Sequence, residues 1–120
     1  MGVTEGDGSM VTIETTPEFE RRAKPLFKKY KSFKSDFAVL LKSLEDNPYS
    51  GADLGNGLHK VRMSISSKGK GKAGGARVIT YTIDKRLDDI KVKLLTIYDK
   101  SEVDNVSDAY IDWILSEIDT

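Results

Sequence analysis

Two stretches in the first half of the chain repeat hydrophobic residues every three to four positions, which is the spacing of an amphipathic helix. The first begins at Thr16 and Pro17, a hydroxyl that can cap a helix followed by a proline suited to its first position. Pro25 lies inside this stretch and should cost one backbone hydrogen bond and bend the helix. The second covers residues 33–46, and the two are expected to form an antiparallel hairpin. The apolar stripes consist of Phe19, Ala23, Leu26, Phe27 and Tyr30 in the first helix and Phe33, Phe37, Leu40, Leu41 and Leu44 in the second.

Alternation of apolar and polar residues predicts strands elsewhere, because neighbouring residues of a strand face opposite sides of its sheet. A short β-branched run at 11–15 must pair with a strand from another part of the chain. Residues 49–57 are typical of a turn-rich connector, and a tight turn near 85–89 should join the last two strands. The run LLTIY at 94–98 indicates burial on both faces. The predicted strands are residues 11–15, 58–66, 77–81 and 90–98, the last three antiparallel.

A last helix is predicted from Ser107, a good capping residue, to about Ile118. Its apolar stripe contains Tyr110, Trp113 and Ile114, so Trp113 is expected in the core. The pattern as a whole predicts an α+β domain, with a helical hairpin and a C-terminal helix packed on one face of an antiparallel sheet of about four strands. A chain of 120 residues is long enough for one such domain with its own core.

Composition narrows the class of protein. Residues 1–9 are small and polar without periodicity, and we expect a disordered leader of the kind that expression vectors add, followed by a single domain at 10–120. Cysteine is absent and His59 is the only histidine, which argues against thiolate or His-rich metal centres, so no metal or cofactor is expected. No apolar run approaches the roughly 20 residues of a membrane span, and no signal peptide is visible. A cytoplasmic protein without a membrane partner is therefore expected.

Charge is sorted along the chain although its total is zero, with 19 basic and 19 acidic side chains. Residues 54–83 contain no Asp or Glu. Such a stretch attracts polyanions, and its glycines would let a phosphate approach the backbone. The simpler interpretation is a solvated hairpin loop, because the Gly/Lys run matches no Walker-type phosphate loop. The cationic residues of the stretch are Lys60, Arg62, Lys68, Lys70, Lys72 and Arg77.

The strand alternation places Lys60 and Arg62 together on one face, and Arg77 with Tyr81 on one face of the next strand. Of the reactions that such residues can catalyse, RNA cleavage needs the fewest catalytic groups from the protein, because the substrate's own 2′-hydroxyl is the nucleophile. The protein has to orient this hydroxyl, accept its proton, stabilise a pentavalent phosphate and protonate the leaving oxygen. Lysine, arginine and tyrosine can supply these functions in a cationic site.

Three segments, KVRM at 60–63, GKAGGARVITY at 71–81 and LLTIYDKSE at 94–102, resemble the RelE/ParE superfamily of bacterial toxins, most closely its HigB-type members. The likeness extends over residues 15–118. It implies a RelE-like fold and a toxin of a type II toxin–antitoxin system. Such a toxin is a ribosome-dependent endoribonuclease, or mRNA interferase, which cuts mRNA in the ribosomal A site and inhibits translation. Its partners would be the ribosome with its rRNA, the mRNA and a cognate antitoxin protein.

The resemblance also assigns roles to residues. The family's basic pair on the first central strand falls on Lys60 and Arg62, and the arginine that holds the scissile phosphate falls on Arg77. The family's late tyrosine has only an approximate counterpart, Tyr110, and the C-terminal histidine of some HigB proteins is missing. The expected catalytic residues are Arg62, Arg77, Lys100, Tyr81 and Tyr98, with Glu102 as a further acid or base, and the expected RNA contacts are Lys60, Lys68, Lys70 and Lys72.

Two other functions remain open at this stage. A ParE-like member of the same superfamily would inhibit DNA gyrase by binding, without catalysis, because fold does not determine function. A degenerate member would retain only antitoxin or RNA binding. Each candidate residue also has a structural interpretation: Arg77 could pair with an acidic helix face, Tyr81 and Tyr98 could be core residues, and Lys100 could form a surface pair with Glu102.

Overall fold

The computed structural model describes residues 10–68, 74–86 and 89–118. The predicted leader, part of the turn predicted before the last strand, and two expected RNA contacts, Lys70 and Lys72, lie outside these ranges. The elements in chain order are β1 (Met10–Thr15), α1 (Pro17–Lys29), α2 (Phe33–Asp46), β2 (Ala52–Gly55), β3 (Leu58–Met63), the 3₁₀ turn η1 (Ser66–Lys68), β4 (Ala76–Arg86), β5 (Asp89–Asp99) and α3 (Asp108–Glu117).

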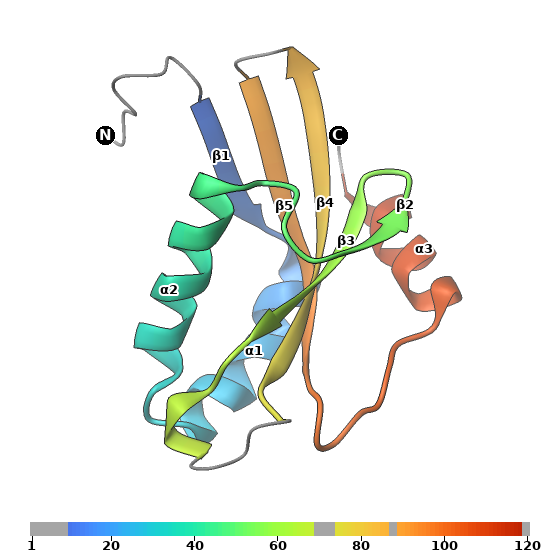
Figure 1. Cartoon of the computed structure of the whole chain (residues 1–120). Coiled ribbons are helices and arrows are strands. Elements are labelled where there is room, and N and C mark those ends of the chain that lie inside the picture. The colour runs from blue at the N-terminus through green and yellow to red at the C-terminus, as the bar shows by residue number, and fades with distance from the viewer. Residues whose placement is uncertain (1–9, 69–73, 87–88, 119–120) are drawn as a thin grey trace.

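The strands form one mixed sheet in the order β1-β5-β4-β3-β2 (Figure 1). Neighbours are antiparallel from β2 to β5, whereas β1 runs parallel to β5, with Met10 opposite Asp89 and Thr15 opposite Leu94. The predicted α+β class is confirmed. The prediction of about four antiparallel strands is wrong, because the described sheet has five strands and one parallel pair.

Both differences have a physical cause. All four residues of β2 are exposed, so this strand carries no alternation of burial and was predicted as a connector. A tight turn joins β2 to β3. In this turn Gly55, Asn56 and Gly57 adopt positive φ angles. For β1, the alternation of apolar and polar residues indicates which side chains are buried. It does not indicate whether the partner strand runs parallel or antiparallel.

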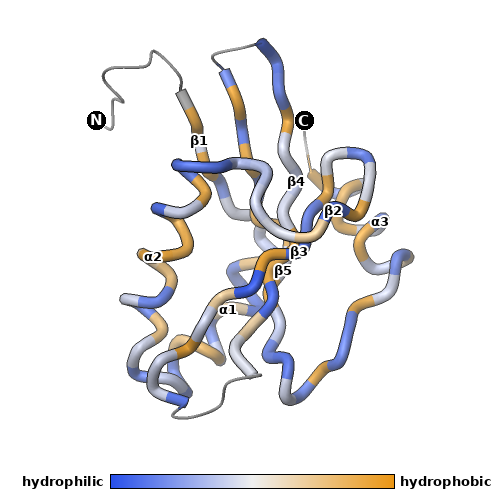
Figure 2. Tube along the Cα trace, in the orientation of Figure 1, coloured by the Kyte–Doolittle hydropathy of each residue, from blue (hydrophilic) through white to orange (hydrophobic). Residues whose placement is uncertain are grey.

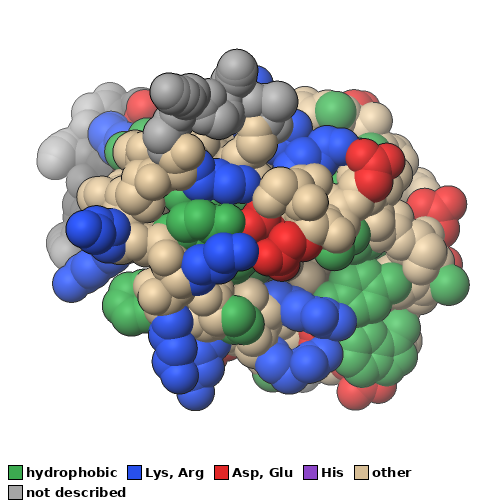
Figure 3. Space-filling view, turned by 90° about the horizontal axis from the view of Figure 1, so that it is seen from below, with side chains coloured by type: hydrophobic (Ala, Val, Ile, Leu, Met, Phe, Trp, Pro, Cys, Tyr) green, Lys and Arg blue, Asp and Glu red, His purple; other side chains and the backbone are tan. Residues whose placement is uncertain are grey.

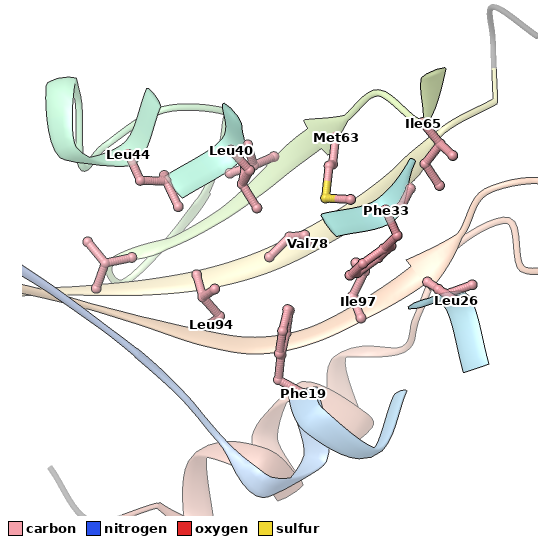
Figure 4. Close-up of a cluster of buried hydrophobic side chains, with 13 residues drawn as sticks. Phe19, Leu26, Phe33, Leu40, Leu44, Met63, Ile65, Val78, Leu94 and Ile97 are labelled. Atoms are coloured by element: carbon pink, nitrogen blue, oxygen red, sulfur yellow. The ribbon is translucent and has the colours of Figure 1, made fainter. Parts of the chain in front are cut away.

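The helices lie on both faces of the sheet, which corrects the prediction of a single covered face. One hydrophobic cluster joins α1 and α2 to the sheet, and Figure 4 shows Phe19 and Leu26 from α1 meeting Val78, Leu94 and other strand residues. A second cluster joins α3 to the opposite face through Ile79 and Leu95. The larger cluster consists of Phe19, Leu26, Phe33, Leu40, Leu44, Val61, Met63, Ile65, Ala76, Val78, Val92, Leu94 and Ile97.

Helix α1 begins as predicted. The Thr16 hydroxyl accepts a hydrogen bond from the Phe19 backbone N–H at 3.0 Å, and the helix continues through Pro25 as one element. Phe27 was expected in the apolar stripe, yet it is 55% exposed and its ring packs edge-on against Phe33. The stripe of α1 is therefore narrower than its sequence pattern indicates.

β5 is buried on both sides because α1 and α2 cover one face of the sheet and α3 covers the other. The strand also contains a β-bulge. Ile79 pairs with Thr96 and Thr80 pairs with Leu94, so Leu95 is the additional residue. Leu94 packs in the cluster beneath α1 and α2, and Leu95 packs in the cluster beneath α3. The predicted burial of the run from Leu94 to Tyr98 on both faces is confirmed.

Helix α3 is capped by Ser107, whose hydroxyl accepts a hydrogen bond from the Tyr110 backbone N–H at 3.1 Å. The prediction that Trp113 lies in the core is wrong, since it is 47% exposed and stacks on Tyr110. Ile111 and Ile114 contact the sheet instead. A short helix on a sheet buries a narrow line of residues, and Trp113 lies beside that line. Figure 2 shows that the long segment between β5 and α3 is mostly hydrophilic. Within the described residues, no helix is long and apolar enough to cross a membrane.

Candidate functional site

Three of the expected catalytic residues form a row across the sheet. Arg62 on β3 lies directly opposite Arg77 on β4, and Arg77 lies opposite Tyr98 on β5. Adjacent strands are about 4.8 Å apart, so the row spans roughly 10 Å. Tyr98 belongs to the cluster beneath α3, and cross-strand partners share a face, so the row lies on the α3 face of the sheet.

Local chain geometry positions this row. Gly75 precedes β4 with a φ of +69°, and a Cβ atom there would lie 2.7 Å from the Met63 carbonyl oxygen. Only glycine therefore lets the start of β4 approach the end of β3 so closely. The Lys100 backbone N–H donates to the Gly75 carbonyl at 3.1 Å, which fixes the end of β5 beside Arg77.

The two arginines are cross-strand partners on one face of the sheet. Like charges opposite each other on neighbouring strands destabilise a sheet. Arg62 is exposed, and the half-buried Arg77 guanidinium donates to two backbone carbonyls, those of Gly74 at 3.1 Å and Ala76 at 3.3 Å. Among the described residues, no Asp or Glu lies within ion-pair distance of Arg77, so the acidic partner considered for it from the sequence is not found there. Two guanidinium groups on one face of neighbouring strands can together bind an anion such as a phosphate.

Tyr98 contributes a proton donor at one end of the row. Its side chain is 7% exposed, and its hydroxyl donates to the Asn105 side-chain oxygen at 3.4 Å. Burial raises the pKa of Tyr98 above its ordinary value, and the positive charges of Arg77 and Lys100 only partly oppose this. The phenol is therefore protonated at neutral pH.

Two lysines border the row, and both contact the segment that follows β5. We call residues 101–107 the strap. The Lys60 ammonium donates to the Asn105 side-chain oxygen at 3.2 Å, and the Lys100 ammonium pairs with the Asp104 carboxylate at 2.6 Å. Asn105 thus joins Lys60 to Tyr98, a connection that depends on the path of the strap and that sequence analysis missed.

Other expected site residues lie elsewhere. Tyr81 is four residues from Arg77 along β4, about 13 Å away at the rise of a strand, and it packs against the α3 cluster. Glu102 pairs with Lys29 of α1 at 2.8 Å rather than with Lys100. Lys68 lies on η1, where its ammonium pairs with Asp99. The structure therefore brings together Lys60, Arg62, Arg77, Tyr98 and Lys100, and leaves Tyr81, Lys68 and Glu102 outside the group.

Asp99 anchors the end of β5 on the side opposite the row. Its carboxylate accepts hydrogen bonds from Tyr30 at 2.6 Å, from the Ser101 hydroxyl at 2.7 Å and from the Lys68 ammonium at 2.9 Å. Burial alone would raise the pKa of Asp99, but these hydrogen bonds outweigh burial and hold it well below its ordinary range. The positive charge of Lys68 is therefore balanced by Asp99 within the fold.

Tyr110, the approximate counterpart of the family's late tyrosine, is also outside the row. Its hydroxyl donates to the buried carboxylate of Glu18 and lies 2.9 Å from the Thr96 hydroxyl. Burial, and then the bond to Glu18, raise the pKa of Tyr110. A pocket of about 390 Å³ lies beside it, between α1, the end of β5 and the strap. The Arg22 guanidinium lies over the Tyr110 ring at 5.7 Å, so this tyrosine connects α3 to α1.

Figure 3 views the molecule from the end where β5 finishes and shows Lys and Arg side chains in several separate groups with acidic side chains between them. At this end of the molecule, the Lys and Arg side chains therefore do not form one continuous cationic surface. Within the described ranges, no group of three or more His, Asp or Glu side chains is arranged to hold a metal ion. No known protein-family model matches the chain. The chemistry of the row itself, two guanidinium groups beside a protonated phenol, fits binding of a phosphate or similar anion.

Proposed function

We propose that this protein is the toxin of a type II toxin–antitoxin system, a HigB-like member of the RelE/ParE superfamily with that family's fold. It would enter the ribosomal A site, cleave mRNA there as a ribosome-dependent endoribonuclease, and be silenced by a cognate antitoxin protein in the cytoplasm. The observation that carries the proposal is the row of Arg62, Arg77 and Tyr98, which aligns two cations and a proton donor across three strands.

In this proposal the two arginines hold the scissile phosphate. The 2′-oxygen attacks phosphorus, and Arg62 and Arg77 stabilise the charge that develops on the pentavalent phosphate. Water takes the proton of the 2′-hydroxyl, Lys60 and Lys100 stabilise the negative charge of the attacking 2′-oxygen as ammonium groups, and Tyr98 gives a proton to the leaving 5′-oxygen as its bond to phosphorus breaks. The products are a 2′,3′-cyclic phosphate and a free 5′-hydroxyl.

The test is to map mRNA 5′ ends after brief induction of the protein in bacteria, with translation allowed or blocked. The wild type should create new ends within translated codons only while translation continues. Arg77→Ala should lower cleavage by about 100-fold or more, because it removes charge stabilisation in the transition state. Arg86→Ala is the matched control, since Arg86 is an exposed arginine at the far end of the same strand. Normal cleavage by a folded Arg77→Ala variant would contradict the assignment.

Two other outcomes would identify the alternative functions. Arrested DNA replication with intact mRNA would indicate a ParE-like inhibitor of gyrase. Intact mRNA with normal growth would indicate a degenerate module that retains antitoxin or RNA binding. Both outcomes would leave the row as a binding site for an anionic partner and remove its catalytic role.

A further inference from the structure

The strap places oxygen atoms against the cationic groups of the candidate site. The Asn105 side-chain oxygen accepts hydrogen bonds from Lys60 and Tyr98, and it also accepts one from the Val106 backbone N–H at 3.0 Å. The Asp104 carboxylate pairs with Lys100, and the positive charge of Lys60 also acts on it. Lys60, Tyr98 and Lys100 therefore already have oxygen partners from the protein's own chain.

The middle of the strap is held weakly, whereas its ends are fixed. Residues 101–105 are all exposed, and Glu102 reaches α1 through an ion pair with Lys29 whose two side chains are both about half exposed. At one end, the buried Asp99 accepts hydrogen bonds from the backbone N–H and the hydroxyl of Ser101. At the other end, Ser107 caps α3. Between these anchors, the Glu102 and Val103 N–H groups donate to the Asp99 carbonyl at 2.9 Å, and Val106 packs against the α3 cluster. The residues that can move away from the sheet without disturbing these contacts are therefore Asp104 and Asn105.

We infer that the strap is an internal competitor for the anion-binding row: the side-chain oxygens of Asp104 and Asn105 occupy positions that RNA phosphates take when the strap opens. This inference rests on the proposed function and adds regulation to the same site. A ligand with several linked phosphates can replace both contacts at once, whereas an isolated phosphate replaces only one. The strap therefore favours an extended RNA segment over free phosphate.

The size of the effect follows from the kind of contact. Exposed ion pairs and neutral hydrogen bonds contribute little to stability in water. Loss of the Asn105 contacts should therefore tighten RNA binding by about 2–10-fold. Asn105→Ala is the informative variant because it leaves the net charge unchanged, so a gain in affinity cannot come from general electrostatic attraction.

The first measurement is fluorescence anisotropy of a short, labelled, 2′-O-methylated oligouridylate, which can bind but cannot be cleaved. Asn105→Ala should bind it more tightly than the wild type, and Arg77→Ala should bind it more weakly. Asp104→Asn should also bind more tightly than Asp112→Asn, which removes one exposed negative charge from α3. Unchanged or weaker binding by Asn105→Ala would overturn the inference, and weaker binding would make Asn105 a direct RNA contact.

A second measurement separates this inference from the proposed function. Acetylation of the Lys60 amine by an activated ester, followed by mass spectrometry, should be faster in Asn105→Ala if the strap shields Lys60. If RNA binding depends on Arg77 but Asn105→Ala changes neither the RNA affinity nor the rate of Lys60 acetylation, the proposed function stands. The inference that the strap competes with RNA would then be overturned. Faster acetylation of Asn105→Ala with no RNA binding by any variant would overturn both the proposed function and the inference that the strap competes with RNA. The strap would then only shield the Lys60 amine from solvent.

Discussion

Asp99 shows how one residue connects the candidate site to the core. It follows Tyr98 directly in β5, so its side chain lies on the opposite face of the sheet. There it joins Tyr30 at the end of α1 to Lys68 on η1. Because Tyr98 and Asp99 are consecutive residues, this buried hydrogen-bond network fixes the position of Tyr98 at the end of the row and the start of the strap.

Removing this carboxylate should destabilise the fold strongly. Asp99→Ala leaves the Lys68 ammonium, whose side chain is 13% exposed, without its ionic partner. Breaking a buried ion pair in this way typically lowers the free energy of unfolding by about 3–5 kcal/mol. Urea unfolding followed by circular dichroism would measure the loss. Asp104→Ala is the control, because Asp104 is an exposed partner of Lys100 and its loss should leave the unfolding midpoint nearly unchanged.

The proposed role of Tyr98 as a proton donor predicts a different result for two tyrosines of the same sheet. Tyr98→Phe should lower the cleavage rate by about 100-fold or more, while the fold persists because, within the described part of the chain, the phenol makes a single long hydrogen bond. Tyr81→Phe should retain activity, because Tyr81 is about 13 Å from Arg77 along the strand. Cleavage assays on translating ribosomes would compare the two, and equal losses would argue against the row as the reacting site.

Strand alternation alone predicted part of the site. Lys60 and Arg62 share a face because they are two residues apart, and Arg77 is on the same face through strand pairing. The pairing of Lys68 with Asp99 joins residues far apart in the sequence and leaves no local signal. Asn105 was missed for the same reason, since its contacts depend on how the strap crosses the sheet.

At the scale of elements, the packing of α3 on the second face of the sheet leads to a prediction for two adjacent apolar residues of this helix. Ile114→Ala should lower the free energy of unfolding by about 2–5 kcal/mol, because the Ile114 side chain is 1% exposed and its loss leaves a cavity. Trp113→Ala should have a much smaller effect because Trp113 is half exposed. Chemical unfolding of both variants would measure the difference, and a larger loss for Trp113→Ala would contradict this packing of α3.

Helices were easier to predict than strand partners. Capping residues such as Thr16 and Ser107 mark helix starts through contacts within one turn, and both starts were predicted correctly. The direction of β1 and the existence of β2 depend on pairing between distant segments. An exposed strand such as β2 also lacks the burial pattern by which strands are recognised.

For the whole molecule, three buried carboxylates predict how stability depends on pH. Burial alone would raise the pKa of Glu18, Asp36 and Asp99, but hydrogen bonds to their ionised forms outweigh burial and lower each pKa. The unfolded chain, in which such groups titrate near pH 4, therefore binds protons more tightly than the folded molecule at that pH. The free energy of unfolding should be highest above about pH 5 and fall as the pH decreases through about 4.

Urea unfolding at several pH values between about 3 and 7 would test this dependence. Asp99→Asn should show a shallower decrease, because it removes the group whose pKa is lowered most. Stability that did not change over this range would contradict the assigned hydrogen bonds. At the alkaline end, Tyr98 and Tyr110 have raised pKa values, so stability should be lost as the pH rises above about 10.

The strand order also determines when the sheet can form during synthesis. β5 lies between β1 and β4, yet it follows the other four described strands in the chain. β1 therefore has to wait for a partner 79 residues later, with Thr15 opposite Leu94, while the apolar faces of α1 and α2 remain uncovered. Contacts of such long sequence separation slow folding and leave hydrophobic surface exposed to other chains in the meantime. The nascent protein should accordingly depend on chaperones until β5 has been made, and the row of Arg62, Arg77 and Tyr98 should form in the same step that completes the core.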